Sequence, residues 1–179
     1  TFDPPHLGHE QCIRAALDVL PSATVIVSPT PAPVPVSGGS QKFARFDLSE
    51  RVDLCKTAFE SMGEQIVVEA IEEGMPAPHY TFRTLQVLRP RCDRLWLLLG
   101  ADQFGQLDRW RDPASLLAAA SVLVVSRTGF GTDMATRLSR ACRSEWMAKG
   151  VDRLWCRDLS SEVIFCAHPA FDASSTVVR

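Results

Sequence analysis

The sequence predicts an α/β fold, in which a doubly wound parallel sheet carries helices on both faces. Two observations support this fold class. Short runs that are apolar throughout alternate along the chain with longer stretches of helical periodicity. Strands that are apolar on both faces belong in a parallel sheet covered by helices, and right-handed crossovers join such strands.

The predicted elements alternate along the whole chain. We expect helices at GHEQCIRAALDVL (8–20), LSERVDLCKTAFESM (48–62), YTFRTLQVLR (80–89), PASLLAAA (113–120) and TDMATRLSRACRSEWMAKG (132–150). We expect strands at TVIVS (24–28), IVVEA (66–70), RLWLLLG (94–100), SVLVVS (121–126) and EVIFC (162–166). Asp47 with Glu50 predicts a capping box at the second helix, and Asp112 before Pro113 predicts a capped start at the fourth.

Size and composition indicate one globular domain, residues 1–179. The net charge of −2 argues against a broad basic surface, so we expect neither nucleic acid nor a membrane as partner. The longest apolar run, residues 116–125, is shorter than the roughly 18 residues of a membrane span. The six cysteines form no CxxC pair, which favours reduced thiols and a cytoplasmic protein. We expect both termini to be trimmed, because the chain has no initiator Met and starts and stops inside motifs.

In a doubly wound sheet, ligands bind at the carboxyl ends of strands, so the loops there are the candidate sites. The first is TFDPPHLGH (1–9), where His6 and His9 lie one turn apart at a helix start and Gly8 leaves room for a ligand. Two imidazoles and a helix N-terminus suit a nucleotide phosphate. A zinc pair and two incidental surface histidines are the alternatives. A Pro-rich, then Gly-rich loop, residues 28–43, is predicted to cover this crevice.

Two further segments carry candidate ligand-binding residues. In DASSTVVR (172–179), hydroxyl groups at a helix start and Arg179 suit a second anion site, although a capped helix with a solvated arginine is an alternative. In LLLGADQFGQLDRW (97–110), Asp102 at the end of a strand suits a nucleotide and Trp110 suits an aromatic ring. The alternatives are that Asp102 caps the next helix and that Trp110 covers the core.

Taken together, these segments resemble a known family. TFDPPHLGH resembles the family motif GGTFDPxHxGH without its two leading glycines, and SSTVVR resembles the closing motif SSTxIR. Between them, LLLGADQF resembles the family's GAD segment and APHYTFRTL resembles its SYTxxTL segment. VVSRTGF resembles the family's strand that is followed by an arginine. The chain is thereby identified as a member of the HxGH nucleotidyltransferase superfamily, similar to bacterial nicotinate-nucleotide adenylyltransferases. The resemblance implies a Rossmann-like nucleotidyltransferase fold. It also implies a reaction of ATP with nicotinate mononucleotide that gives deamido-NAD and pyrophosphate in NAD biosynthesis.

The resemblance implies roles for individual residues. His6, His9 and Arg179 would be catalytic and hold the ATP phosphates. Tyr80, Thr81 and Trp110 would bind the mononucleotide, the first two at its carboxylate and Trp110 at its pyridine ring. The remaining ATP-binding residues would be Thr1, Phe2, Gly8, Lys42, Gly100, Asp102, Arg127, Ser174, Ser175 and Thr176. Mg²⁺, bound mainly through the ATP phosphates, would be the cofactor, with no dedicated metal ligand in the chain.

The flap departs from the family pattern. The common PPHK motif is replaced by PAPVPVSGGSQK, and only Lys42, with Phe46 and Arg51, resembles the flap. Arg111 also follows Trp110 where an aromatic residue is frequent. The rival functions are therefore adenylyl transfer to nicotinamide mononucleotide or pantetheine phosphate, and a nucleotide-binding module without catalysis. ATP and a mononucleotide are the expected partners, and a homo-oligomer is possible.

Overall fold

The computed structural model describes residues 2–32, 44–126 and 133–167 of the chain. These residues divide into two compact units, the first ending at His79 and the second beginning at Tyr80. Each unit is described by itself below. The expectation of one domain over residues 1–179 stays a prediction.

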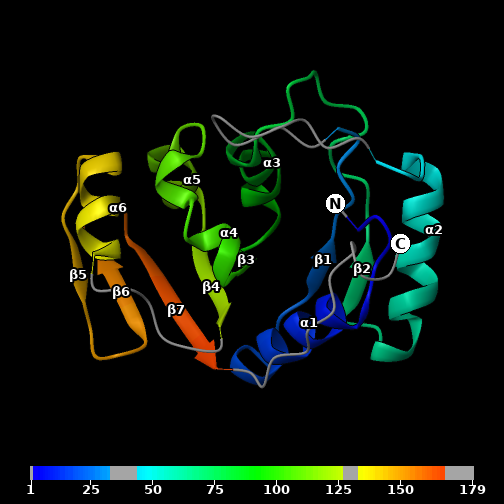
Figure 1. Cartoon of the computed structure of the whole chain (residues 1–179), viewed down its shortest axis with the longest axis horizontal. Coiled ribbons are helices and arrows are strands. Elements are labelled where there is room, and N and C mark those ends of the chain that lie inside the picture. The colour runs from blue at the N-terminus through cyan, green and yellow to red at the C-terminus, as the bar shows by residue number, and fades with distance from the viewer. Residues whose placement is uncertain (1, 33–43, 127–132, 168–179) are drawn as a thin grey trace. The chain divides into compact units, whose positions relative to one another are not determined.

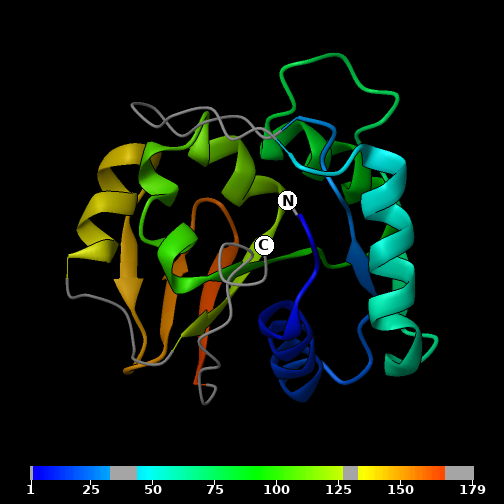
Figure 2. The same ribbon diagram turned by 45° about the vertical axis from the view of Figure 1, so that its right-hand side comes forward.

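The first unit combines a pair of parallel strands with two helices. Its elements are α1 (Leu7–Val19), β1 (Val25–Val27), α2 (Leu48–Phe59), a 3₁₀ turn (Glu60–Met62) and β2 (Ile66–Val68). Val25 lies opposite Ile66 in the register of the two strands. Helix α2 runs beside this strand pair (Figure 2). A small core joins Ile13 of α1 to Val27 and to Phe59 of α2, and it packs the middle of α1 against the end of α2.

The second unit contains a mixed five-stranded sheet among its described residues. Its order is β3-β4-β7-β6-β5, in which β3, β4 and β7 are parallel and β6 and β5 are antiparallel to their neighbours (Figure 1). Its strands are β3 (Trp96–Gly100), β4 (Ser121–Ser126), β5 (Trp146–Ala148), β6 (Arg153–Cys156) and β7 (Ser161–Ala167). Its helices are α3 (Thr81–Leu88), α4 (Ala101–Phe104), α5 (Pro113–Ala119) and α6 (Met134–Cys142), with 3₁₀ turns at Arg89–Arg91 and Leu107–Arg109.

The core of the second unit lies between the sheet and its helices. Leu116 and Leu117 of α5, Leu138 of α6, and Val122 and Val124 of β4 are completely or almost completely buried in it. Helix α5 packs against α3, α6 and β4. Burial of these branched side chains contributes to the apolar driving force of the unit.

The α/β class is confirmed, and each of the five predicted strands contains an observed strand that pairs in parallel with another. Both predicted caps are confirmed. Asp47 Oδ1 accepts the N–H of Glu50 at 2.8 Å, and Glu50 Oε2 accepts the N–H of Asp47 at 2.9 Å. Asp112, at φ 50°, caps α5 by accepting the N–H of Ser115 at 3.1 Å. Hydrogen bonding to the Ser115 side chain, followed by this backbone hydrogen bond, lowers the pKa of the Asp112 carboxyl.

The predicted helix over residues 132–150 is wrong beyond Cys142. Arg143 adopts a left-handed conformation at φ 53°, which ends α6. The N–H of Trp146 then donates to Ser139 Oγ at 2.8 Å, and the Trp146 side chain is buried in the core. The sequence that follows forms β5 and β6, neither of which was predicted. These two strands make the sheet mixed instead of parallel throughout.

Candidate functional site

Helix α1 begins at a capping box made of two histidines. Nδ1 of His6 accepts the N–H of Gly8 at 3.2 Å, and Nδ1 of His9 accepts the N–H of His6 at 3.2 Å. In the usual capping box, a serine or threonine and a glutamate fill these two roles. The prediction that both histidines lie together on the first turn of a helix is confirmed.

This capping box determines what the two rings offer to a ligand. Because each Nδ1 accepts a backbone N–H, each neutral ring carries its proton on Nε2. The ring centroids of His6 and His9 lie 3.8 Å apart with an interplanar angle of 34°. The turn therefore presents two Nε2–H donors beside the positive end of the helix dipole, an arrangement suited to phosphate oxygens.

The pKa values of both histidines are lowered, which favours the neutral rings at pH 7. Burial, followed by the charge of His6, lowers the pKa of His9 to about 3. Burial also lowers the pKa of His6 from its ordinary value. The Phe2 ring lies 4.6 Å from the His9 ring and packs edge-on against Phe59 at 6.2 Å, which contributes to this burial. In the neutral form, the two rings offer hydrogen-bond donors and not two positive charges.

We expect the folded protein to keep His9 neutral well below pH 6.5. Between about pH 6.5 and 3, the unfolded chain binds a proton at His9 that the folded chain does not bind. The free energy of unfolding therefore falls as the pH falls through this window. NMR titration of the His9 ring in the free protein measures the pKa directly. A midpoint near 6.5 would contradict the buried, Nδ1-accepting ring.

Two buried charged residues, Asp3 before α1 and Arg51 in α2, both bind the backbone of Phe46. The Asp3 side chain accepts the N–H of Arg45 at 2.9 Å and that of Phe46 at 3.1 Å. Arg51 Nε donates to the carbonyl of Phe46 at 3.1 Å, and Nη1 donates to that of Thr30 at 2.9 Å. Each of the two residues is only 1% exposed. Thus Arg51, expected in the flap pattern, holds backbone carbonyls of the first unit.

Sequence reasoning gave Asp3 no role of its own. An aspartate before a proline in a loop is usually a solvated turn residue. Its two partners lie 42 and 43 positions further along the chain, and no local pattern indicates such a contact. The one available signal was its place within the TFDPPHLGH motif.

In the second unit, β3 runs directly into α4 at Gly100. A Cβ atom on Gly100 would lie 3.0 Å from Asp102 Oδ1, a tight contact that a small shift of the exposed Asp102 side chain would relieve. Asp102 lies in the first turn of α4, is exposed, and accepts Gln103 Nε2 at 3.3 Å. The alternative that Asp102 caps this helix is wrong, because the N-cap is Gly100 and no side chain bonds there.

The residues predicted to bind the mononucleotide also lie in the second unit. Tyr80 is the N-cap of α3 without a side-chain capping bond, and Thr81 is the first residue of that helix. Trp110 is half-buried and packs against the large core. Its indole N–H is buried and has no hydrogen-bond partner among the described residues. Trp110 therefore does contact the core, and its stacking on a pyridine ring stays a prediction.

The predicted site residues fall into three groups. The first unit brings together Phe2, His6, Gly8 and His9, and the second unit holds Tyr80, Thr81, Gly100, Asp102 and Trp110. The assembly of these two groups into one site stays a prediction. The others, Thr1, Lys42, Arg127, Ser174, Ser175, Thr176 and Arg179, lie outside the described residues.

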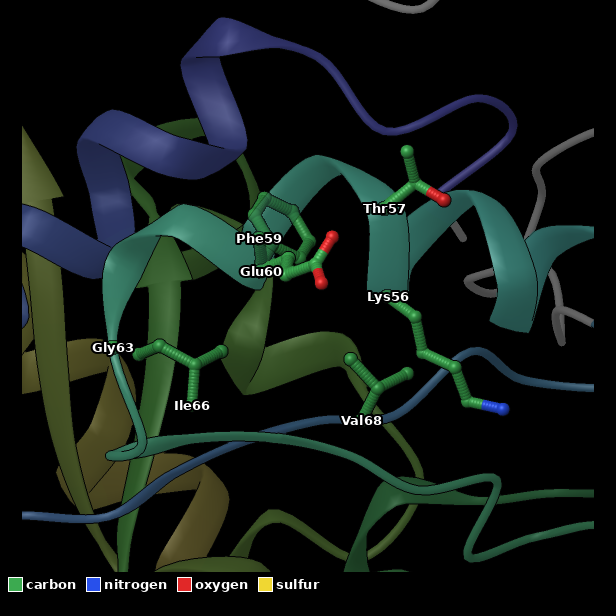
Figure 3. A pocket seen from close by; sticks show the side chains of 7 residues that line it. All are labelled: Lys56, Thr57, Phe59, Glu60, Gly63, Ile66 and Val68. Atoms are coloured by element: carbon green, nitrogen blue, oxygen red, sulfur yellow. The ribbon is translucent and has the colours of Figure 1, made fainter.

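A hollow of about 310 Å³ opens between α2 and β2 (Figure 3). Its lining contains none of the predicted site residues and consists of Lys56, Thr57, Phe59, Glu60, Gly63, Ile66 and Val68. Within the described ranges, no three His, Cys, Asp or Glu side chains cluster as a metal site would require. None of the described helices has the length and apolar character needed to cross a membrane.

Known proteins match the chain over most of its length. A family model described as cytidylyltransferase-like matches residues 1–179. A probable nicotinate-nucleotide adenylyltransferase of Chromobacterium violaceum is 31% identical over 182 residues, covering 100% of this chain and 82% of that protein. The nicotinate-nucleotide adenylyltransferase of Bacillus subtilis (strain 168) is 28% identical over 186 residues, and the match covers 100% of this chain and 80% of that protein. A probable nicotinate-nucleotide adenylyltransferase of Chlorobium luteolum is 32% identical, and the match covers 72% of this chain and 66% of that protein, just under two thirds of its length.

Proposed function

The chain belongs to the cytidylyltransferase-like family, and we propose that it is an adenylyltransferase that joins ATP and nicotinate mononucleotide. The observation that carries the proposal is the two-histidine capping box, which aims two Nε2–H donors from one helix start. The printed names of the relatives, nicotinate-nucleotide adenylyltransferases, support the choice of substrates. The match of the whole chain to the family supports the nucleotidyltransferase fold and confirms the superfamily resemblance.

In the proposed reaction, an oxygen of the mononucleotide 5′-phosphate attacks the α-phosphorus of ATP in line. A new bond forms between this oxygen and the α-phosphorus, and the bond from the α-phosphorus to the oxygen that bridges to the β-phosphate breaks. Pyrophosphate leaves with the electron pair of the broken bond. His6 and His9 donate hydrogen bonds to the phosphate oxygens as this charge develops. No covalent enzyme intermediate is needed, because catalysis of this kind depends on positioning and electrostatic stabilisation.

The remaining predicted residues complete the proposal. We assign Asp102 to the adenosine side, Arg127 to a contact on or beside the adenine, and the N–H groups of Tyr80 and Thr81 to the nicotinate carboxylate. The Phe2 ring packs beside the His9 ring, and Gly100 is assigned to ATP binding. The other ATP contacts are assigned to Thr1, Gly8, Lys42, Ser174, Ser175, Thr176 and Arg179. The six free cysteines support our proposal of a reducing, cytoplasmic location.

We propose Mg²⁺ as the cofactor, carried into the site on the phosphates of ATP. The donors of the histidine turn are N–H groups, which suit phosphate oxygens and not a metal ion. Bound in this way, Mg²⁺ would offset part of the phosphate charge. Residues of the chain then orient the phosphates that hold the ion.

Release of pyrophosphate tests the proposed function. The full chain is incubated with Mg²⁺ and ATP, and separately with nicotinate mononucleotide, nicotinamide mononucleotide or pantetheine phosphate as acceptor. We expect the highest kcat/KM with nicotinate mononucleotide. Preference for another acceptor would replace the substrate while leaving adenylyl transfer intact. No release with any acceptor, combined with measurable ATP binding, would favour the nucleotide-binding module.

Trp110 offers a separate test of mononucleotide binding. We expect Trp110→Leu to raise the KM for the mononucleotide roughly two- to tenfold, the value of one lost aromatic stacking contact, and to leave kcat nearly unchanged. Leucine keeps apolar contact with the core. Trp155→Leu is the matched control, since Trp155 is a half-buried tryptophan of β6 under Lys149. An unchanged KM with a lowered Tm would assign Trp110 to the core alone.

A further inference from the structure

An ion pair that the proposed chemistry does not use holds the turn between α4 and α5. Arg137 of α6 donates through Nε to Asp108 Oδ2 at 3.2 Å and through Nη2 to Asp108 Oδ1. Nη2 also donates to the carbonyl of Gly105 at 2.8 Å. One guanidinium therefore binds both ends of the four-residue segment 105–108, from a helix 29 positions further along the chain.

This segment lies between two of the proposed ligand-binding residues. Asp102 precedes the segment and Trp110 follows it, and local backbone hydrogen bonds link the segment to the residues on either side. The N–H of Gly105 donates to the carbonyl of Ala101 at 2.9 Å, and that of Trp110 to the carbonyl of Leu107 at 3.1 Å. Leu107 is fully buried in the core. The buried leucine fixes the middle of the segment, and Arg137 fixes its ends.

The geometry of the pair makes arginine hard to replace. A planar guanidinium can bind both oxygens of a carboxylate and a third acceptor at once, whereas a lysine ammonium is a point charge. Arg137 and Asp108 are mostly shielded, with 32% and 18% of their side chains exposed. Asp133 Oδ2 also lies 3.9 Å from Arg137 Nη1. The hydrogen bond to Asp108 raises the pKa of Arg137, so its charge is constant over the working pH range.

We propose that Arg137 is a positioning residue, which acts through Asp108 and the Gly105 carbonyl to set the placement of Asp102 and Trp110. The inference rests on the proposed function, because it assigns ligand contacts to those two residues. Arg137 itself touches neither substrate. Its guanidinium determines how far apart the adenosine contact and the pyridine contact are held.

Hydrogen exchange tests the positioning part without any assay of activity. In Arg137→Gln, we expect the amides of residues 101–112 to exchange at least roughly tenfold faster than in wild type, since the segment loses its anchor on α6. Arg140→Gln is the matched control, because Arg140 is exposed on the same helix. Equal exchange in the two variants would overturn the proposal.

Kinetics test the link to substrate binding. We expect Arg137→Gln to raise the KM for the mononucleotide roughly three- to tenfold, with kcat within about twofold of wild type. Arg137→Lys should raise this KM less than Arg137→Gln does. Asp108→Asn should give a smaller rise in KM. The double variant Asp108→Asn/Arg137→Gln should have a KM close to that of Arg137→Gln alone. A fall in Tm with unchanged KM would overturn the proposal. If wild type shows no transfer, the proposed function fails while the exchange result still decides whether Arg137 holds the segment.

Discussion

Replacing His9 with asparagine is expected to lower kcat about 100-fold or more, the usual effect of losing one donor to a developing phosphate or oxyanion charge. Asparagine keeps an acceptor near the position of Nδ1, which receives the N–H of His6 at 3.2 Å. It has nothing at the position of Nε2. The variant thus separates the two functions of the ring, because the helix cap survives and the phosphate donor is lost.

The complementary variant is His9→Gln, whose side-chain amide reaches the position of Nε2. We expect this variant to keep part of the turnover, with a helix start less well capped than in His9→Asn. Arg14→Ala, at an exposed position of the same helix, is the control and should match wild type. Steady-state kinetics with ATP and the mononucleotide, together with Tm, measure both effects. Turnover near wild type in His9→Asn would rule out the phosphate role.

Elements whose burial is encoded locally could be predicted from the sequence. The apolar runs at β3 and β4 and the caps at Asp47 and Asp112 depend on neighbours within a few residues. The histidine turn was predictable for the same reason, since both rings and both N–H groups lie within four residues. Its neutral, Nδ1-accepting state was not, because it depends on burial by Phe2 and on the capping geometry.

Features that depend on distant partners could not be predicted. Strand β5 lies in a segment that the sequence predicts as the end of a helix, and β6 lies just beyond it, where no element is predicted. Trp146 of β5 is buried in the core and pairs with Cys156 of β6. The contacts of Asp3 and Arg137 could not be predicted either, because they too depend on distant partners. Each bonds to groups at least 29 positions away. The periodicity of apolar residues predicts which face of an element is buried. It does not predict which charged side chain forms a hydrogen bond with a group far away in the sequence.

Removing the buried guanidinium of Arg51 is expected to destabilise the protein more than any other single change considered. Arg51→Met keeps the apolar stem but leaves the carbonyls of Thr30 and Phe46 without its two donors. Losing hydrogen bonds from a buried charged group to partly buried carbonyls lowers the free energy of unfolding by about 3 kcal/mol. In a chain of this size, that loss lowers Tm by roughly 6 to 12 °C. Urea unfolding and calorimetry measure the two quantities.

The control for Arg51→Met is Lys56→Met, which removes a cation from the same helix. The Lys56 side chain is 60% exposed and pairs weakly with Asp53 at 3.5 Å, so its loss should change the free energy of unfolding by less than about 1 kcal/mol. Arg51→Lys tests geometry, because a single ammonium cannot easily span both carbonyls and should restore only part of the stability. Equal stability of Arg51→Met and Lys56→Met would mean that the buried contacts contribute nothing net. A large difference would show that the hydrogen bonds of Arg51 to the carbonyls of Thr30 and Phe46 stabilise the protein.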